Sequence, residues 1–392
     1  FLKDVTWLDN LKFRVGLGTT GNSSVDPYAT KGDITGVYLP FNGMNNQIGY
    51  VTNEPYYIKD GKPMANEELG WEKTTQVNFG IDFGVLNNRI SASIDAYFSR
   101  TNDLLMQTNI PTLTGYPNTY ANIGKTKNHG VEISLNAVPV QTKSGFTWDT
   151  SLNAAYQKDE IVELAYGKND MVSNAWFIGE SIGVYYGYQN DGLWQDTPED
   201  RGEMEKWNAN GYHFTPGNVK PKDQDGDYKM GENDRVVLGN KAPRWTMGWS
   251  NNFSWKGIEL GITLNGRMGY MVDGKEESLT GHANQRELDY WTPDNPDAEY
   301  QKPILGQSSS GSMDEFSGTL GYKNAAFLKI RNISLGYNFP KSMITKLGIS
   351  HLKVYGQVLN PGSLYQSIEG YDLDTGNTYF NRSFVFGLEL GF

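Results

Sequence analysis

The chain has no cysteine and only four histidines among its 392 residues. Without thiols it can form neither disulfides nor thiolate metal sites, and four scattered histidines argue against a histidine-based metal centre. It also lacks any run approaching the roughly 18 apolar residues that a membrane-spanning helix requires. Hydrophobic residues make up 38% of the chain, and the mean hydropathy is −0.55. The net charge of −11 argues against nucleic acid as a partner.

The sequence motifs of common enzyme classes are missing as well. The chain contains no P-loop, no nucleophile elbow and no zinc-ligand spacing. Residues 16–21, GLGTTG, match the glycine pattern of a dinucleotide-binding turn, but that fingerprint needs a following helix to bind the pyrophosphate. The segment after it is polar and broken by Pro27, which favours a strand running into a loop. The sequence therefore predicts no enzyme, no catalytic residue and no organic cofactor.

What the chain does contain is glycine and aromatic residues, with 45 Gly, 24 Tyr, 17 Phe and 10 Trp. Many lie in segments where every second residue is apolar, which indicates strands because successive side chains of a strand point to opposite faces. The alternation predicts about ten strands. They are centred on residues 13–17, 77–83, 90–98, 131–137, 146–156, 245–253, 258–264, 333–339, 352–358 and 384–392.

The connections between these segments alternate in length. Short turns are expected at 86–89, 139–145, 255–257 and 340–348, and long polar segments at 19–71, 107–125, 161–243, 271–325 and 360–379. Outer-membrane β-barrels alternate short periplasmic turns with long external loops in this way, whereas a soluble sandwich has no reason to do so. We therefore expect an all-β fold, an antiparallel transmembrane barrel with long extracellular loops.

A barrel strand also predicts which side chains face lipid and which face the interior. In the third predicted strand Ile90, Ala92, Ile94 and Ala96 should face lipid, and Ser91, Ser93, Asp95 and Tyr97 should face inward. Burial of Ile94 against a second sheet would instead favour a sandwich.

The last strand carries the clearest stripe. Its apolar face consists of Phe384, Phe386, Leu388, Leu390 and Phe392, and glycines, Val385 and Glu389 form the other face. An exposed apolar edge strand invites aggregation in a soluble protein, but in a closed barrel the same strand pairs on both sides and its apolar face meets lipid.

Several segments, in their order along the chain, resemble the SusC/RagA family of TonB-dependent outer-membrane transporters of Bacteroidota. They are WLDNLKFRVGLGTTGN (7–22), LGWEKTTQVNFGIDFGVLNNRISASIDAYFSRTNDLL (69–105), NIGKTKNHGVEISLNAVP (122–139), FTWDTSLNAAYQKDEIVEL (146–164), IGVYYGYQNDGLWQ (182–195), VKPKDQDGDYKMGENDRVVLGNKAPRW (219–245) and FLKIRNISLGYNFP (327–340). The resemblance implies that residues 1–392 are the C-terminal part of a barrel of about 22 strands. The remaining strands, the plug and the TonB-contacting segment would then lie outside this sequence.

The resemblance also implies a function and partners. Members of the family import large nutrients, usually oligosaccharides and in some cases peptides, with energy delivered through TonB. A SusD-like surface lipoprotein closes over the barrel, and the transporter–lipoprotein pair can form a dimer. The terminal stripe ending in Phe392 matches the signal that the barrel-assembly machinery reads.

The long loops contain aromatic residues that are candidates for contact with substrate or partner. Exposed Trp and Tyr faces stack against sugar rings or pack on a protein surface. The alternative is that these side chains pack loop against loop above the barrel. The candidates are Trp194, Tyr290, Trp291, Tyr365 and Tyr371.

Within the long loop 161–243, the segment DQDGDYKMGEND (223–234) resembles a twelve-residue calcium loop. Asp223, Asp225 and Asp227 occupy positions 1, 3 and 5, the Lys229 carbonyl position 7, and Asp234 position 12. Tyr228 stands where the sharp turn of such a loop wants glycine, and the flanks show no helical pattern. We expect a weak Ca²⁺ site without an EF-hand; the alternative is a solvated acidic turn.

Two other classes of function remain open from the sequence. One is an outer-membrane structural or adhesive barrel, and the other is a soluble glycan-active β-protein. Extraction from membranes separates the last from a barrel, because a barrel needs detergent and migrates in a heat-dependent way on a gel.

Overall fold

The computed structural model describes residues 5–23, 35–36, 39–41, 44–47, 56–57, 63–114, 116–273, 287–303, 315–369, 371–376 and 381–392. Contacts divide the chain into two compact units. One comprises Phe1–Ile133 with Tyr156–Ile182, and the other comprises Ser134–Ala155 with Gly183–Phe392.

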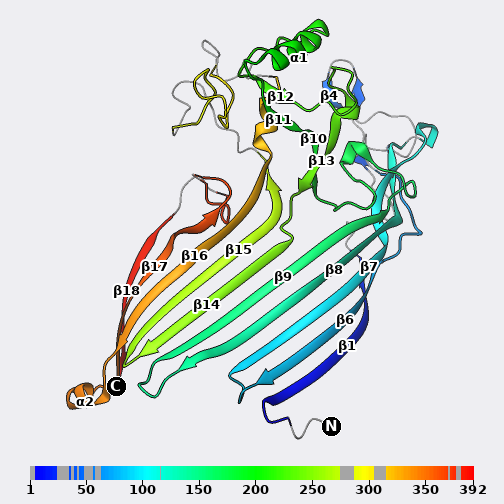
Figure 1. Ribbon diagram of the computed structural model, residues 1–392. Coiled ribbons are helices and arrows are strands. Elements are labelled where there is room, and N and C mark those ends of the chain that lie inside the picture. Colours follow the sequence, from blue (N-terminus) through cyan, green and yellow to red (C-terminus); the bar gives the residue numbers. More distant parts are fainter. Residues whose placement is uncertain are drawn as a thin grey trace. The chain divides into compact units, whose positions relative to one another are not determined.

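The main element of the fold is a ten-stranded sheet with the order β1-β6-β7-β8-β9-β14-β15-β16-β17-β18 (Figure 1). Its edges are β1 and β18, and every defined strand register is antiparallel. The predicted all-β class and ten strands are confirmed. The strands are β1 Leu8–Asn22, β6 Glu72–Val85, β7 Ile90–Asn109, β8 Asn118–Gln141, β9 Thr147–Glu163, β14 Trp245–Trp255, β15 Ile258–Val272, β16 Lys323–Asn338, β17 His351–Gln366 and β18 Ser383–Gly391.

Short and long connections alternate along this sheet as the sequence predicts, except that the connection at 110–117, expected to be long, is short. The short ones are residues 86–89, 142–146, 256–257 and 339–350. Tight hairpins need residues that tolerate positive φ. Asn87 and Asn88 adopt φ of 58° and 56° in the first hairpin, and Lys256 and Gly257 adopt φ of 48° and 89° in the third. The glycine lies so close to the Asn338 carbonyl that a side chain there would collide with it.

Some strands are longer than the apolar pattern predicts. The sequence places Pro139 in a turn, but β8 includes it and ends at Gln141. The expected long connection at 107–125 is also wrong, because β7 ends at Asn109 and β8 begins at Asn118. A polar segment can continue the backbone ladder beyond the last apolar residue, so composition alone marks strand ends poorly.

In the first unit, cross-strand neighbours form alternating apolar and polar rows. Phe13 lies opposite Ile81, which in turn lies opposite Ile94. In the polar row, Arg14 donates hydrogen bonds to Asp82 and Asp95, each at 2.8 Å. Ile94 is 37% exposed, whereas the sandwich alternative requires its burial under a second sheet.

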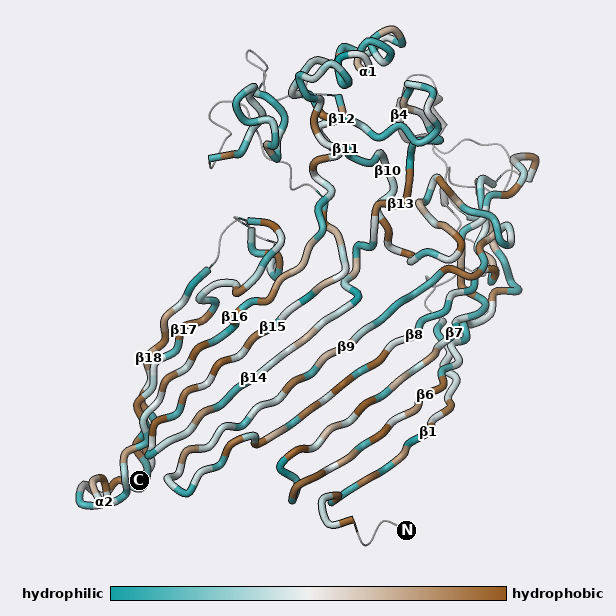
Figure 2. The backbone as a smooth tube through the Cα atoms, viewed as in Figure 1, coloured by the Kyte–Doolittle hydropathy of each residue, from teal (hydrophilic) through white to brown (hydrophobic). Residues whose placement is uncertain are grey.

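The second unit shows the same arrangement in β14 to β18. One row runs through Trp255, Ile258, Tyr337, Val354 and Leu388, which lie opposite one another in successive strands. The adjacent row runs through Ser254, Glu259, Gly336, Tyr355 and Gly387. Figure 2 shows this alternation of hydrophobic and hydrophilic residues along the strands. The sheet therefore has an apolar face and a polar face.

The connections carry the remaining elements. Among the described residues, short strands form four pairs: β2 Thr35–Gly36 with β5 Tyr56–Tyr57, β3 Leu39–Phe41 with β4 Met44–Gln47, β10 Val184–Tyr188 with β13 Arg235–Asn240, and β11 Asn190–Leu193 with β12 Val219–Pro221. The helices of this part of the chain are α1 Pro198–Ala209 and α2 Lys341–Ile344, and its 3₁₀ turns are η1 Thr112–Thr114, η2 Val172–Asn174, η3 Glu232–Asp234, η5 Ser317–Gly321 and η6 Thr345–Leu347.

None of the helices among the described residues is both long enough and apolar enough to cross a membrane. The segment GLGTTG lies wholly within β1, so the structure agrees with a strand and not with a nucleotide-binding turn.

Candidate functional site

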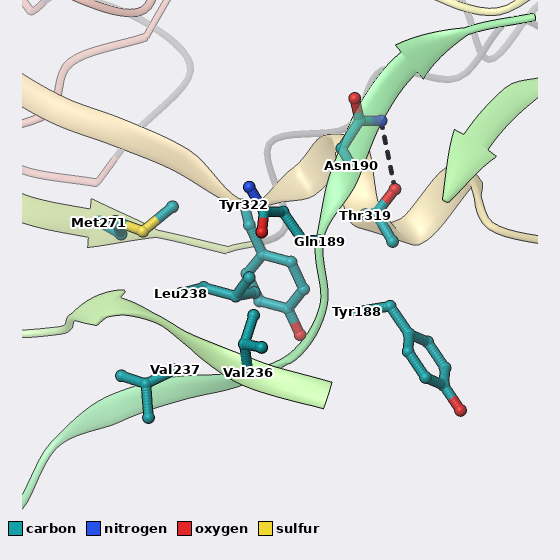
Figure 3. A pocket seen from close by; sticks show the side chains of 9 residues that line it. All are labelled: Tyr188, Gln189, Asn190, Val236, Val237, Leu238, Met271, Thr319 and Tyr322. Atoms are coloured by element: carbon teal, nitrogen blue, oxygen red, sulfur yellow. Dashed lines mark hydrogen bonds between the residues drawn. The ribbon is translucent and has the colours of Figure 1, made fainter. Parts of the chain in front are cut away.

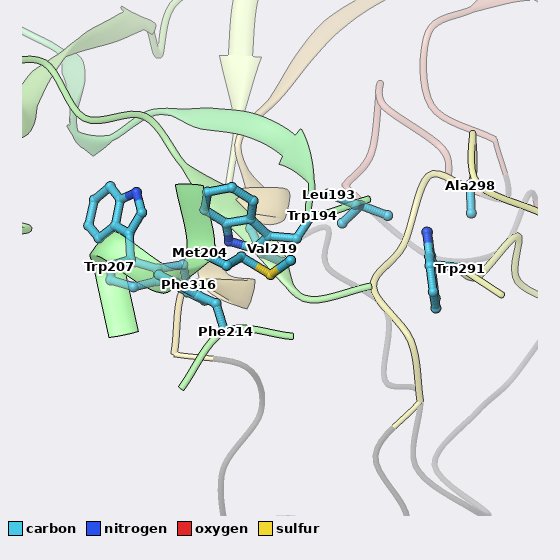
Figure 4. Packing of buried hydrophobic residues seen from close by; sticks show 9 residues of the cluster. All are labelled: Leu193, Trp194, Met204, Trp207, Phe214, Val219, Trp291, Ala298 and Phe316. Atoms are coloured by element: carbon cyan, nitrogen blue, oxygen red, sulfur yellow. The ribbon is translucent and has the colours of Figure 1, made fainter. Parts of the chain in front are cut away.

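The β9–β14 and β15–β16 connections fold together around a hydrophobic cluster, which we call the loop core. Nine buried residues form it: Leu193, Trp194, Met204, Trp207, Phe214, Val219, Trp291, Ala298 and Phe316 (Figure 4). Helix α1 contributes Met204 and Trp207. The Trp207 ring meets those of Tyr212, Phe214 and Tyr228 edge-on, with centroid distances of 5.2, 5.7 and 6.1 Å. The long loops therefore have an apolar core of their own.

Two of the predicted contact residues belong to this core. Trp194 is 0% exposed and Trp291 is 7% exposed. The Trp291 indole donates a hydrogen bond to Gln195 Oε1 at 3.0 Å, which joins the two connections. For these two tryptophans the prediction of an exposed contact face is wrong, and the alternative of loop packing against loop describes them.

A charged group covers the core on one side. Lys220 Nζ lies 4.3 Å from the centroid of the Trp194 ring, 2.8 Å from Glu203 and 3.3 Å from Asp200. Burial lowers the pKa of Lys220 and the two carboxylates raise it, with a net rise above its ordinary value. The lysine is therefore charged, and it fastens β12 to helix α1 by a cation–π contact and ion pairs.

The other predicted contact residues remain accessible. Tyr290 is 43% exposed and Tyr365 is 57% exposed, while Tyr371 is half-buried in the β17–β18 connection. Their role as contacts with substrate or partner stays a prediction.

The segment predicted to bind calcium forms a compact turn in which three carboxylates converge. Oxygens of Asp223, Asp225 and Asp227 lie within 4.8 Å of one another. Asp223 accepts backbone N–H groups of Gly226 at 2.7 Å and Tyr228 at 2.9 Å. Tyr228 adopts a φ of 60°, so the sharp turn forms at position 6 without glycine. Its ring packs against the loop core, which offsets the strain of that conformation.

Asp234 takes a different place from the one expected for position 12. It is buried, and its two oxygens accept the backbone N–H groups of Gln224 at 2.8 Å and Gly231 at 2.7 Å. The Asp234 carboxylate thus holds the segment closed by binding its backbone N–H groups, and it lies outside the group of three carboxylates. The flanks form the strands β12 and β13, so an EF-hand is absent from this described segment.

A pocket of about 250 Å³ lies beside the loop core, between β10, β13, the end of β15 and η5. Tyr322, Leu238 and Met271 supply apolar surface, and Gln189 and Asn190 supply amides (Figure 3). Asn190 donates a hydrogen bond to Thr319 at 3.3 Å. Aromatic and amide side chains around a small cavity can hold one sugar ring or one peptide side chain. The sequence analysis missed this pocket because its walls come from four separate segments.

The C-terminal strand presents its apolar stripe as predicted. Phe386 is 84% exposed and Phe392 is 93% exposed, while Phe384, Leu388 and Leu390 are also exposed. On the polar face, the Tyr355 ring covers Gly387 so closely that a side chain at that glycine would collide with it. The two faces of β18 thus differ in both polarity and shape.

Comparisons with known proteins agree with this architecture. Residues 4–361 match the sequence model of the TonB dependent receptor-like β-barrel. The chain is similar to the TonB-dependent receptor SusC of Bacteroides thetaiotaomicron, with 30% identity over 100% of this chain and 38% of that protein. It is similar to TonB-dependent receptor P3 of Formosa agariphila, with 28% identity over 100% of this chain and 40% of that protein.

Among solved structures, the chain is similar to one described as the RagAB peptide transporter. The TM-score is 0.71, with 27% identity over 100% of this chain and 42% of that chain. The chain thus spans about two fifths of the length of the relatives that it matches.

Proposed function

The chain belongs to the TonB-dependent receptor-like β-barrel family, and we propose that its sheet is part of the wall of an outer-membrane transporter. The observation that carries this proposal is the pair of faces on the ten-stranded sheet. Apolar rows such as Phe13–Ile81–Ile94 are exposed. On the other face, the side chains of Arg14, Asp82 and Ser93 form an ion-paired and hydrogen-bonded network. A barrel wall needs lipid on one face and water on the other.

The proposed activity is TonB-dependent import of a large nutrient across the bacterial outer membrane. Oligosaccharide is the first candidate, supported by the exposed tyrosines and by the pocket beside the loop core. Peptide is the second candidate, supported by the likeness to the RagAB peptide transporter. The burial of Trp194 and Trp291 removes part of the argument for sugar stacking, so the two classes must be compared directly.

The proposed partners are TonB and a SusD-like surface lipoprotein. The order of the strands supports the position of this lipoprotein. The β9–β14 and β15–β16 connections, which form the loop core and the pocket, follow the fifth and seventh strands of an antiparallel sheet, so both leave from the same end of the strands. We place that end outside the cell, where the lipoprotein would close over it.

Uptake measurements test the proposed function. A strain lacking the full-length protein should lose uptake of one nutrient class, either oligosaccharides or peptides, and the wild-type gene should restore it. Because the energy for the proposed import is delivered through TonB and depends on the proton gradient, a proton uncoupler should abolish the restored uptake. An adhesive barrel would leave uptake unchanged in both strains, and a glycan-active soluble protein would be released from membranes without detergent.

We also propose that the segment 223–234 binds Ca²⁺ weakly, through Asp223, Asp225, Asp227 and the Lys229 carbonyl. Oxygens bound to one calcium ion at 2.3–2.6 Å lie at most about 5 Å apart, and the three carboxylates meet that limit. Neutralising their mutual repulsion would stabilise the segment and, through Tyr228, the loop core.

Calcium should protect the β9–β14 connection from protease, with half-maximal protection at roughly 10⁻⁴–10⁻³ M. The double substitution Asp225→Asn with Asp227→Asn should remove the protection, because two hard oxygen ligands lose their charge. Asp191→Asn, at an exposed position of β11, is the matched control and should retain it. Equal protection by Mg²⁺, or none by Ca²⁺ in the wild type, would show a solvated acidic turn instead.

A further inference from the structure

A buried ionic cluster joins the β17–β18 connection to strands β15 and β16. Lys329 is 0% exposed, and its Nζ lies 2.7 Å from Asp372 and 3.7 Å from Asp374. Arg331 lies 2.8 Å from Asp374, and Arg267 lies 3.6 Å from it. Three cationic side chains from the sheet thus share two carboxylates from the loop.

The cluster lies on the polar face of the sheet. Lys329 pairs with Asn265 across β15 and β16, and Asn265 donates a hydrogen bond to Asp374 at 3.3 Å. Asn265 alternates along β15 with Leu264, whose row belongs to the apolar face. In a barrel, these cations would therefore line the water-filled interior.

The loop presents its two carboxylates from a single turn. The backbone N–H of Asp374 donates to the Asp372 carboxylate at 3.2 Å, and that of Gly376 donates to the Asp372 carbonyl at 2.8 Å. Burial raises the pKa of Asp372, but hydrogen bonds from Lys329 and Thr375 outweigh it and hold the pKa below its ordinary value. The Asp372 carboxylate beside Lys329 is therefore ionised.

Such a cluster is a costly way to hold a loop in place. Removing charges from water offsets much of their attraction, and apolar residues of similar size often stabilise a fold as well or better. Among the residues that the structure describes, the cations of the cluster also exceed the carboxylates in number, and the side chains of Arg267 and Arg331 remain 43% and 47% exposed. Guanidinium groups that stay partly exposed on a polar wall suit bidentate recognition of a carboxylate.

We propose that Arg267, Lys329 and Arg331 form a binding site for an acidic group of the cargo, and that the chain's own loop occupies this site with Asp372 and Asp374. A carboxylate of an acidic peptide or of a uronic-acid oligosaccharide would displace the loop carboxylates and bind the same cations. The identity of the ligand as cargo rests on the proposed transport function. The anion site itself can be measured without transport.

Malonate, a small dicarboxylate, is the probe for the site in the full-length, detergent-purified protein. The double substitution Asp372→Asn with Asp374→Asn should bind malonate at least tenfold more tightly than the wild type by calorimetry. Loop carboxylates tethered nearby compete at an effective concentration in the millimolar range, and the substitution removes that competition. Adding Lys329→Met should abolish the gain.

Glu259→Gln is the matched control. Glu259 forms an ion pair with Lys353 at 2.7 Å, also on the polar face, so the substitution exposes a single cation and should leave malonate affinity unchanged. A double variant that binds malonate no better than this control overturns the anion site.

A second measurement leaves all five charged residues intact. Leu373→Cys places a thiol between the two carboxylates in a chain that has no cysteine of its own. Malonate at 100 mM should speed maleimide labelling of this thiol at least twofold relative to chloride of equal ionic strength. An unchanged rate would contradict displacement of the loop, even if the double variant fails to fold.

Competition identifies the source of the acidic group. An acidic peptide and an oligogalacturonate are each tested for displacing malonate from the double variant. Displacement by one of them supports the proposal and names the cargo class. If neither competes while malonate binds, the site exists but the claim that it receives cargo is wrong, and uptake data decide the transport function independently.

Discussion

A positive charge on the apolar face of β18 should prevent stable insertion of the protein into the outer membrane. Phe386 is 84% exposed near the middle of the strand, in the row of Gly356 and Leu335. Phe386→Arg would place a guanidinium against lipid, at a cost of about 2–4 kcal/mol near the bilayer midplane. We expect little or no heat-modifiable, surface-accessible protein in cells that express this variant.

Val385→Arg is the control for that substitution. Val385 is the chain neighbour of Phe386 and lies on the polar face, opposite Gln357. The same charge would there meet the watery interior, and insertion should be near normal. Equal loss in both variants would mean that β18 tolerates no charge on either face, and normal surface levels of both would contradict a lipid-facing stripe.

The second large effect is expected from Trp207→Ala in the loop core. Trp207 is 1% exposed and contacts the rings of Tyr212, Phe214 and Tyr228. Truncation of a buried tryptophan costs about 3–5 kcal/mol. Because about 1.4 kcal/mol corresponds to a factor of ten, the opened form of the loops should become roughly 10² to 4 × 10³ times more populated.

Limited proteolysis measures this opening. Residues 164–244 should be cleaved much faster in Trp207→Ala, while the sheet remains folded and heat-modifiable, because the core is built from the connections alone. Tyr290→Ala is the control, since Tyr290 is exposed beside the core and its loss should leave the cleavage rate unchanged. Unchanged cleavage in Trp207→Ala would show that the loops do not fold as one unit.

The strands of the sheet were predictable because each carries its own signal. Alternation in a segment such as Ile90–Phe98 reports which residues share a face, and it needs no knowledge of the neighbouring strand. The ends of the strands were less predictable, because β8 continues through Pro139 on backbone pairing. Helix α1 was missed although Thr197 caps it, Pro198 begins it and acidic residues fill its first turn.

The candidate site depended on contacts between distant segments. In the sequence, Trp194 and Trp291 are aromatic residues of two separate loops. Their burial results from contacts between these loops, such as the hydrogen bond between Trp291 and Gln195, which are 96 positions apart. Lys329 appears as an ordinary lysine on a polar strand face, because its partner Asp372 is 43 positions away. Local periodicity holds no information about either pairing.

Labelling of single cysteines introduced along β7 tests most directly the claim that the sheet is a wall between lipid and water. The chain has no cysteine of its own to interfere. Ser93→Cys and Ile94→Cys are compared in the full-length protein in outer-membrane vesicles. If the sheet is a barrel wall, a water-soluble maleimide labels position 93, and a lipid-soluble maleimide labels position 94. Labelling of both positions from water, or protection of position 94 from both reagents, would contradict a wall between lipid and water.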